Sequence, residues 1–344
     1  MESIASRRPC YAITAVITLA LSLSGCASAP REASALASMP LRLTGDATIA
    51  ILGDTQLTPL FVRAVMRRES NGRAQQRLFD DLYARIDGLA AFIVVGDLVF
   101  TGQSSSDWRH FDALVAPIAR QMPVLPALGN HDYHCKLVRN CDHDALPADV
   151  SARFPWLAPG RPYSVGFGRA VLVFLDTEIS LAEQGRWLRA RLPTFERSFE
   201  WAIIMMHRPP FTDSLLPGVE PDPALRSEIV AAFADSALVP IFISGHAHGY
   251  EHQLVDGRHF IVTAGGGGPR GRLRNARPYD VYAGPDCDTD AKGRLMRPLN
   301  YLLVRSRDDV LEVTARGFCK EDPELGVLET FEIPAQPATP GARH

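Results

Sequence analysis

The chain has 344 residues, of which 46% are hydrophobic, and its 36 basic residues nearly balance 39 acidic ones, for a net charge of −3 at pH 7. A chain of this length and apolar content can bury an ample core. The slightly negative balance argues against nucleic acid as a partner, because binding through phosphate contacts requires an excess of lysine and arginine.

Residues 1–25 have the organisation of an export signal. Arg7 and Arg8 precede the uncharged run 11–23, which has about the length of a signal's hydrophobic region and is short for a membrane span. The run ends in Leu-Ser-Gly-Cys at residues 23–26, which resembles a bacterial lipobox. The resemblance implies cleavage before Cys26, acylation of that residue, and a lipid-anchored lipoprotein on the periplasmic side of a membrane in the bacterial cell envelope. The alternative is an ordinary cleaved signal in which Cys26 is incidental.

The composition then divides the rest of the chain into a tether, a folded domain and a tail. Residues 26–47 are rich in alanine, serine and proline, and they predict a flexible tether between the lipid and the body. The folded domain is expected at residues 48–334, with a disordered tail at 335–344.

The body retains an even set of cysteines, namely Cys135, Cys141, Cys287 and Cys319. In an exported chain such a set predicts disulfides, because the compartment is oxidising. Pairing of sequence neighbours gives Cys135–Cys141 and Cys287–Cys319, although two other pairings are possible. A zinc site is the alternative for the first pair, with His134, Cys135, Cys141 and His143 as ligands.

From residue 48 onward, short apolar runs alternate with amphipathic stretches, which is typical of an α/β protein. Strands are predicted, in chain order, at residues 48–52, 91–95, 122–128, 170–175, 201–206, 239–243, 260–263, 301–305 and 310–314. Helices are predicted at residues 74–86, 108–121, 182–191 and 226–234. The sequence contains no visible internal repeat and no heptad pattern.

Polar residues follow several of these strands at the point where the apolar run ends. They are Asp54, Gln56, Asp97, Asn130, His131, His207, His246 and His248. Strand ends meet at one edge of an α/β scaffold, so these side chains are expected to form one site. Carboxylate, amide and imidazole groups without a thiolate suit Mn²⁺, Fe²⁺ or Zn²⁺. Taken singly, each residue could instead be a turn residue, a helix cap or a histidine satisfied within the protein.

The order of these motifs resembles the calcineurin-like metallophosphoesterases. The motifs are Asp-x-Gln at 54–56, Gly-Asp at 96–97, Gly-Asn-His-Asp at 129–132, His at 207 and Gly-His-x-His at 245–248. The resemblance implies an α/β (α+β) four-layer sandwich, with two mixed β-sheets flanked by helices, and a site for two divalent metal ions (Mn, Fe or Zn).

Carried over position by position, the resemblance makes Asp97 the bridge between both ions. One ion would be completed by Asp54, Gln56 and His248. The other would be completed by Asn130, His207 and His246. His131, oriented by Asp132, would donate a proton or a hydrogen bond to the substrate.

This sequence departs from the family pattern at Gln56, where most members have histidine. An amide oxygen is neutral like imidazole but is a poorer ligand for these metals, so one ion is expected to be held more weakly. Two stretches, at 132–133 and 246–251, also resemble purple acid phosphatases. Phe100 stands where those proteins have the tyrosine that holds iron, and it cannot ligate.

The resemblance implies hydrolysis of a small phosphoester by a hydroxide that bridges the two ions, with a phosphomonoesterase as the first hypothesis. A phosphodiesterase with the same site is the second. The third is a catalytically silent lipoprotein that binds a partner through the same scaffold. Two loops remain to be interpreted, one rich in glycine and the other acidic. Residues 265–268 are either a tight turn or backbone that passes close to the site, and residues 286–290 read as a solvated acidic loop.

Overall fold

The computed structural model describes residues 42–43, 48–134, 146–157, 162–215, 218–272, 280–282, 287, 296–320 and 324–335. The predictions for the export signal, Cys26, Cys135, Cys141, His143 and the tail after residue 335 therefore lie outside the described residues. In the part of the chain that is described, no helix combines the length and the apolar character needed to cross a bilayer.

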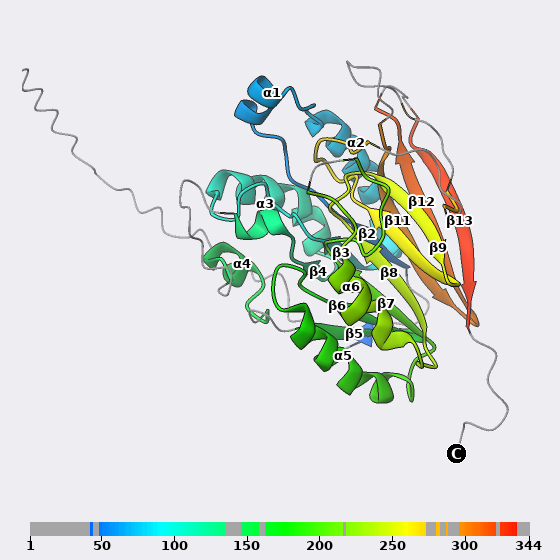
Figure 1. Ribbon diagram of the computed structural model, residues 1–344. Coiled ribbons are helices and arrows are strands. Elements are labelled where there is room, and N and C mark those ends of the chain that lie inside the picture. The colour runs from blue at the N-terminus through cyan, green and yellow to red at the C-terminus, as the bar shows by residue number, and fades with distance from the viewer. Residues whose placement is uncertain are drawn as a thin grey trace, which may run out of the picture. The chain divides into compact units, whose positions relative to one another are not determined.

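Two mixed β-sheets form the centre of the folded body (Figure 1). The seven-stranded sheet has the order β1-β5-β6-β7-β8-β10-β9. Its strands are β1 (Arg42–Leu43), β5 (Tyr163–Phe167), β6 (Ala170–Phe174), β7 (Trp201–Met206), β8 (Val239–Ser244), β9 (Tyr250–Val255) and β10 (Arg258–Thr263). The run β6-β7-β8-β10 is parallel, which places the carboxyl ends of these strands at one edge.

The six-stranded sheet has the order β13-β12-β11-β2-β3-β4. Its strands are β2 (Thr48–Leu52), β3 (Leu89–Val95), β4 (Val124–Ala127), β11 (Leu299–Arg307), β12 (Val310–Phe318) and β13 (Gly326–Pro334). Strands β2, β3 and β4 are parallel, whereas β11, β12 and β13 are antiparallel to their neighbours.

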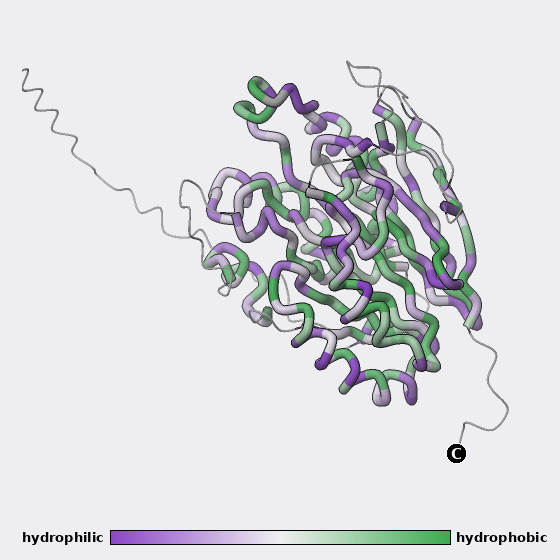
Figure 2. Tube along the Cα trace, in the orientation of Figure 1, coloured by the Kyte–Doolittle hydropathy of each residue, from purple (hydrophilic) through white to green (hydrophobic). Residues whose placement is uncertain are grey.

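The strands are uninterrupted apolar runs because both faces of each sheet are covered. In β2, Ile49 and Ile51 pack between the two sheets, whereas Ala50 and Leu52 pack against helices on the outer face. Successive side chains in a strand point to opposite faces, so a strand covered on both sides loses the alternation of apolar and polar residues. Figure 2 shows these strands as largely hydrophobic segments in the interior of the body.

Helices cover the outer face of each sheet. Helices α2 (Gly72–Tyr83) and α3 (Ser105–Ala119) pack on the six-stranded sheet, together with the short α4 (Ala148–Arg153). Helices α5 (Leu181–Phe195) and α6 (Pro223–Glu228) pack on the seven-stranded sheet. The predicted four-layer sandwich, with two mixed sheets flanked by helices, is therefore confirmed.

The predicted elements are present with shifted ends, and one helix differs more. The helix expected at 226–234 is divided into α6 and a 3₁₀ turn at Val230–Phe233. Helix α6 begins earlier than predicted because the Asp222 carboxylate caps it, accepting a 2.8 Å hydrogen bond from the backbone N–H of Ala224. The sequence also did not predict β1, β5, β9, β13 or the short helices α1 (Leu60–Met66) and α4.

Two further expectations for the ends of the body can be compared with the fold. The prediction of a flexible tether over residues 26–47 is wrong in its C-terminal part. There, Arg42 and Leu43 pair in parallel with Gly166 and Phe167 of β5. The disulfide predicted between Cys287 and Cys319 is present, with the two Cα atoms 5.0 Å apart.

Candidate metal centre

The polar residues at the strand ends meet where the two sheets lie against each other, as the sequence predicted. Asp54 and Gln56 follow β2, and Asp97 follows β3. Asn130 and His131 belong to a 3₁₀ turn (Asn130–Tyr133) directly after β4. From the other sheet, His207 follows β7, and His246 and His248 follow β8.

One group of donor atoms surrounds His207. Its Nε2 lies 3.2 Å from Oδ1 of Asp97, 3.2 Å from Oδ1 of Asn130 and 3.1 Å from Nδ1 of His246. Asp97, His207 and His246 each offer one ligand atom, and these atoms lie within 4.8 Å of one another. All three side chains are buried.

A second group surrounds His248 and shares Asp97 with the first. Nε2 of His248 lies 3.2 Å from Oδ1 of Asp54 and 3.4 Å from Nε2 of Gln56. Gln56 also donates to Oδ2 of Asp97 over 3.1 Å. Asp54, Asp97 and His248 again offer ligand atoms within 4.8 Å of one another. The two groups are thus joined through the Asp97 carboxylate.

Each histidine in these groups turns one ring nitrogen toward a backbone carbonyl and the other toward the centre. Nδ1 of His207, Nε2 of His246 and Nδ1 of His248 are the nitrogens that face carbonyls. Their acceptors are Val95 at 3.0 Å, Gly218 at 3.0 Å and Pro269 at 2.6 Å, respectively. A carbonyl oxygen can only accept, so these nitrogens carry hydrogens, and the other ring nitrogen of each histidine faces the shared centre. Metal-binding histidines are held in the same manner.

The centre holds negative charge and lone pairs that require a cation. Oδ1 of Asp54 and Oε1 of Gln56 are buried and accept no hydrogen bond. Burial alone raises the pKa of Asp97, but His207 and His131 hold it well below its usual value. Burial alone lowers the pKa of His207, yet the Asp97 carboxylate raises it to about 10. A proton on His207 therefore balances the carboxylates in the absence of metal, and it occupies the lone pair that a metal ion would use. The donor set fits two divalent cations.

The backbone is left-handed at four of these residues. Asp54, Asp97, His246 and His248 have φ values of 59°, 53°, 70° and 55°. Such angles are uncommon outside glycine and concentrate at functional sites. They turn the chain sharply where each strand ends. The turns explain how His246 and His248, only two residues apart, can both face the centre.

Glycines allow the loops to approach the centre closely. A Cβ added to Gly129 would lie 2.4 Å from Oδ1 of Asp97, so the Gly-Asn-His-Asp motif needs glycine there. A Cβ on Gly266 would lie 2.3 Å from the carbonyl oxygen of Gly53. The N–H of Gly268 donates to the Asp54 carbonyl over 3.1 Å. Of the two alternatives for residues 265–268, close backbone approach to the site is therefore confirmed.

The His131 ring is oriented differently from the prediction. Nδ1 of His131 donates to the Phe100 carbonyl over 2.8 Å, and the two rings pack with centroids 4.6 Å apart. The buried Asp132 carboxylate instead accepts from the backbone N–H groups of Gly129 and Val99, over 2.9 Å and 3.2 Å. The prediction that Asp132 orients His131 is wrong, because Asp132 holds the loop and a carbonyl holds the ring.

The sequence reasoning missed a guanidinium group beside the centre. Nη1 of Arg208 lies 3.4 Å from Nε2 of His246. Glu178 holds the guanidinium through two hydrogen bonds, of 2.7 Å to Nε and 3.0 Å to Nη2. Arg208 directly follows His207 in the sequence, and this adjacency could have identified it as a residue near the site. Nothing local in the sequence marks Glu178, because it belongs to the loop after β6.

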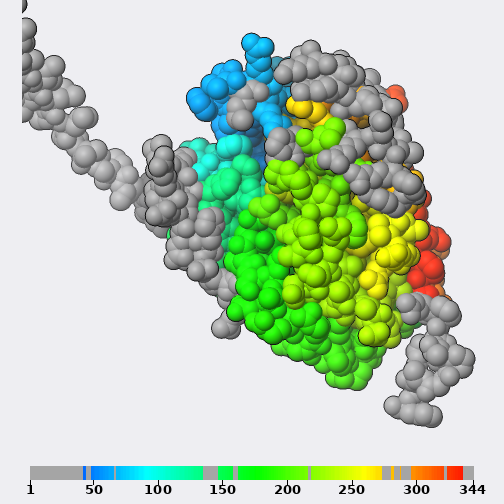
Figure 3. Space-filling view, in the orientation of Figure 1, coloured from blue at the N-terminus to red at the C-terminus, as the bar shows by residue number. Residues whose placement is uncertain are grey.

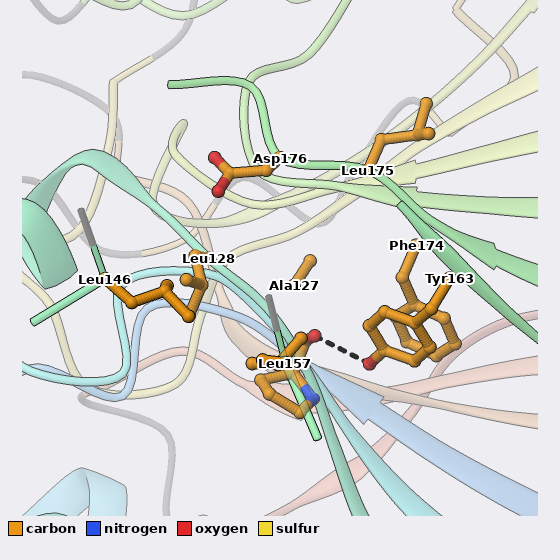
Figure 4. A pocket seen from close by; sticks show the side chains of 9 residues that line it. Ala127, Leu128, Leu146, Leu157, Tyr163, Phe174, Leu175 and Asp176 are labelled. Atoms are coloured by element: carbon orange, nitrogen blue, oxygen red, sulfur yellow. Dashed lines mark hydrogen bonds between the residues drawn. The ribbon is translucent and has the colours of Figure 1, made fainter. Parts of the chain in front are cut away.

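The structure also contains a small hollow that none of the donor residues lines (Figure 4). Its lining is apolar except for two groups. The hydroxyl of Tyr163 donates to the Pro126 carbonyl, and the Asp176 carboxylate accepts a hydrogen bond from the hydroxyl of Tyr133. The pKa of Asp176 is raised to about 6, and burial is the largest cause. The space open to the centre of a water molecule is about 20 Å³, which is room for one ordered water and not for a substrate.

Comparison with known proteins agrees with this geometry. Residues 47–250 match the family model of the calcineurin-like phosphoesterases, and the chain belongs to that family. Two donor groups that share one carboxylate have the form of the dinuclear metal centre typical of this family.

The chain is also similar to a probable purple acid phosphatase 20 of Arabidopsis thaliana, with 24% identity over 168 residues. The match covers 46% of this chain and 39% of that protein, so the chain spans less than half the length of this relative.

Several solved structures share the fold. A purple acid phosphatase (PPD1) from yellow lupin, Lupinus luteus, superposes with a TM-score of 0.65 at 18% identity, covering 86% of this chain and 55% of that one. A dimetal phosphatase from Danio rerio has a TM-score of 0.55 at 15% identity, covering 85% and 100%. GAP50, the anchor in the inner membrane complex of Plasmodium, has a TM-score of 0.56 at 13% identity, covering 86% and 90%.

Proposed function

We propose that this protein is a metal-dependent phosphoric ester hydrolase, and specifically a phosphomonoesterase for small phosphoesters. The observation that carries the proposal is the pair of buried donor groups joined through Asp97. In this assignment Asp97 would hold both ions. Asp54, Gln56 and His248 would complete the site of one ion. Asn130, His207 and His246 would complete the site of the other.

Two divalent cations at this centre would supply Lewis acidity, which lowers the pKa of a bound water and stabilises charge on phosphoryl oxygens. The protein's own contribution is the net charge of the site. Asp54 and Asp97 are the only carboxylates in the donor groups, and the other ligands are neutral. Positive charge is therefore left in excess, which favours an anionic phosphoester over a neutral ester.

His131 is the proposed proton donor to the leaving oxygen. Its backbone N–H donates to Oδ1 of Asp97 over 2.9 Å, which holds the residue beside the bridging carboxylate. Its Nδ1 is bound by the Phe100 carbonyl, so Nε2 is the ring nitrogen free to serve the substrate. A positioned acid of this kind assists departure of an alkoxide, which is a poor leaving group.

Arg208 favours the monoester over the diester. The side chain is partly exposed, and its guanidinium group lies beside His246 at the ring nitrogen that faces Gly218, so it adds positive charge close to the centre. A phosphomonoester carries more negative charge than a diester and gains more from this additional cation. A phosphodiesterase with the same centre is the second candidate.

Two further assignments are proposals of the same kind. The lipobox at residues 23–26 supports acylation of Cys26 and anchoring in the bacterial cell envelope. A catalytically silent, partner-binding role is disfavoured, since each predicted ligand position holds a residue that can donate to a metal.

The test is hydrolysis of 4-nitrophenyl phosphate and of bis(4-nitrophenyl) phosphate by chelator-treated protein resupplied with Mn²⁺, Fe²⁺ or Zn²⁺. We expect metal-dependent turnover with the larger kcat/KM for the monoester. Asp97→Asn should lose bound metal and turnover together, whereas Asp112→Asn, which removes a carboxylate paired with Arg153 away from the centre, should retain both. Preference for the diester would favour the second candidate. Absence of turnover with every metal would favour the silent role.

A further inference from the structure

The short helix α1 (Leu60–Met66) exposes large apolar side chains. Leu60, Phe61 and Val65 are 76%, 72% and 62% exposed, and Ala64 between them is exposed as well. Successive residues of a helix are separated by about 100°, so these positions share one side of α1. Val62, on the opposite side, is only partly exposed. Figure 1 shows α1 projecting from the folded body, and Figure 2 shows it as a hydrophobic segment at the surface.

Basic residues lie next to this apolar side. Arg63, Arg67 and Arg68 follow within and directly after α1, and residues 60–68 contain no acidic residue. Among the described residues, none of these guanidinium groups makes a hydrogen bond or an ion pair. We define the α1 surface as Leu60, Phe61, Ala64 and Val65 together with Arg63, Arg67 and Arg68. Figure 3 shows the blue atoms of this segment at the surface of the face in view.

The helix is firmly connected to the body at its C-terminal end. The chain turns at Arg67, whose φ is 51°, and Glu69 then binds Arg270 through contacts of 2.9 Å and 3.1 Å. The carboxylate of Glu69 also accepts from Asn71 over 3.0 Å. The exposed side of α1 is therefore held outward by the fold and is not a loosely attached end.

We propose that the α1 surface docks on an anionic lipid bilayer. Large apolar side chains flanked by arginines are what an interfacial helix uses: the apolar side enters the boundary of the acyl chains, and the guanidinium groups contact lipid phosphates. A protein partner of acidic character could satisfy the charges but would not require apolar residues at this density on so short a helix. This inference concerns a surface outside the metal centre and does not depend on the proposed activity.

The choice of a bilayer as the occupant also rests on the proposed acylation of Cys26. About 16 residues separate Cys26 from Arg42 at the start of β1, and when fully extended they span roughly 50 Å. A lipid at Cys26 would hold the body within that distance of the membrane. The resulting high local concentration makes even a weak second contact effective.

The experiment places a fluorescent reporter on α1 in the full chain. Phe61→Trp protein is added to vesicles of phosphatidylcholine and phosphatidylglycerol whose acyl chains are brominated. The native protein is measured in parallel, and the quenching of its existing tryptophans is subtracted as background. Val327→Trp is the matched control, because Val327 on β13 is 57% exposed and does not belong to the α1 surface. We expect strong quenching of Phe61→Trp and little additional quenching of Val327→Trp.

Charge dependence provides the second readout. Each arginine at an anionic surface strengthens binding by about fivefold, so Arg63→Gln, Arg67→Gln and Arg68→Gln together should weaken it by roughly 100-fold. Quenching should also fall in high salt and on vesicles of phosphatidylcholine alone.

Quenching of Phe61→Trp no greater than that of Val327→Trp would overturn the proposal. A Val65→Trp protein with the same lack of quenching would show that the result does not reflect one disturbed position. A blue shift of Phe61→Trp emission with rising protein concentration, in the absence of vesicles, would also overturn it and would assign the α1 surface to a second copy of the chain.

Discussion

The side-chain amide of Gln56 donates a 3.1 Å hydrogen bond to Oδ2 of Asp97, while its own oxygen is buried without a donor. In this arrangement the amide nitrogen faces the shared carboxylate. To hold a metal ion on the Asp54 side, the amide would have to present its oxygen, which requires a half-turn of the amide. The rotation gives up the hydrogen bond to Asp97, which is a physical reason for weak binding of that ion.

The first prediction follows from this relationship. Gln56→His replaces the amide with an imidazole, which is a stronger donor to these metals. The substitution should raise the affinity for the more weakly held ion by about tenfold or more. Calorimetric titration of chelator-treated protein with Mn²⁺ measures both affinities. Wild type should show two unequal affinities, and the variant should show them closer together. Equal affinities that Gln56→His leaves unchanged would mean that Gln56 does not bind metal.

Removal of the proposed acid tests the role of His131. His131→Ala should keep both metals and lose roughly 10²- to 10⁴-fold in kcat with an alkyl phosphate. With 4-nitrophenyl phosphate the loss should be much smaller, because the nitrophenolate leaves without a proton. Metal content by mass spectrometry serves as the control. Equal losses with the two esters would exclude His131 as the acid.

A comparison of esters tests the role of Arg208. Arg208→Gln should lower kcat/KM for a phosphomonoester by about 10- to 100-fold, the value of a hydrogen bond to a charged group, and should lower it less for a diester. The Arg208–Glu178 pair is partly exposed, so little change in thermal stability is expected. The same fractional loss for both esters would mean that Arg208 does not distinguish them.

A partly buried cluster that joins the two sheets predicts a contribution to acid sensitivity. Nε2 of His252 lies 2.8 Å from Nδ1 of His259, and the Glu329 carboxylate on β13 lies 2.9 Å from Nδ1 of His252. Burial, and then the neighbouring His252, lower the pKa of His259 from 6.5 to about 4. Between these pH values His259 of the unfolded chain binds a proton that the folded chain excludes, so the contribution of His259 to the free energy of unfolding falls as the pH decreases from about 6.5 to about 4.

His259→Gln should remove this part of the pH dependence. The measurement is the thermal denaturation midpoint at pH 7 and at pH 5, where the difference should be smaller in the variant than in wild type. The pKa of Glu329 is lowered, so this group changes the free energy of unfolding only at pH values below the ordinary pKa of a glutamate. It therefore does not affect the comparison above pH 5. An unchanged difference would show that His259 titrates normally.

Fractionation in a bacterial host tests the proposed anchor. Cys26→Ser should move the protein from the membrane fraction to the soluble fraction after a high-salt wash, because several acyl chains anchor firmly and none can be attached to serine. The wash matters because salt also weakens contact of the α1 surface with anionic lipid. Retention of the variant after the wash would contradict acylation at Cys26.

The sequence by itself predicted which residues come together at the candidate metal centre and which kind of fold brings them together. Asp54, Asp97, Asn130, His207 and His246 each follow an apolar run within a few residues, and that relation is local and readable. The strands are buried on both faces, so their apolar runs are unbroken and their ends are easy to place. The segments that the sequence did not reveal, such as β9 and β13, carry polar residues among the apolar ones and include the outermost strand of each sheet.

Only the tertiary structure decided how the centre is held. The carbonyl groups of Gly218 and Pro269 orient His246 and His248, and a carbonyl carries no mark of its role in the sequence. The same holds for Phe100, whose carbonyl, and not Asp132, orients His131. Tertiary contacts also decide exposure. Residues 60–66 are mostly apolar, yet Phe61 lies at the surface. Glu69, shortly after α1, is bound to Arg270, and among the described residues α1 contributes no side chain to the core clusters.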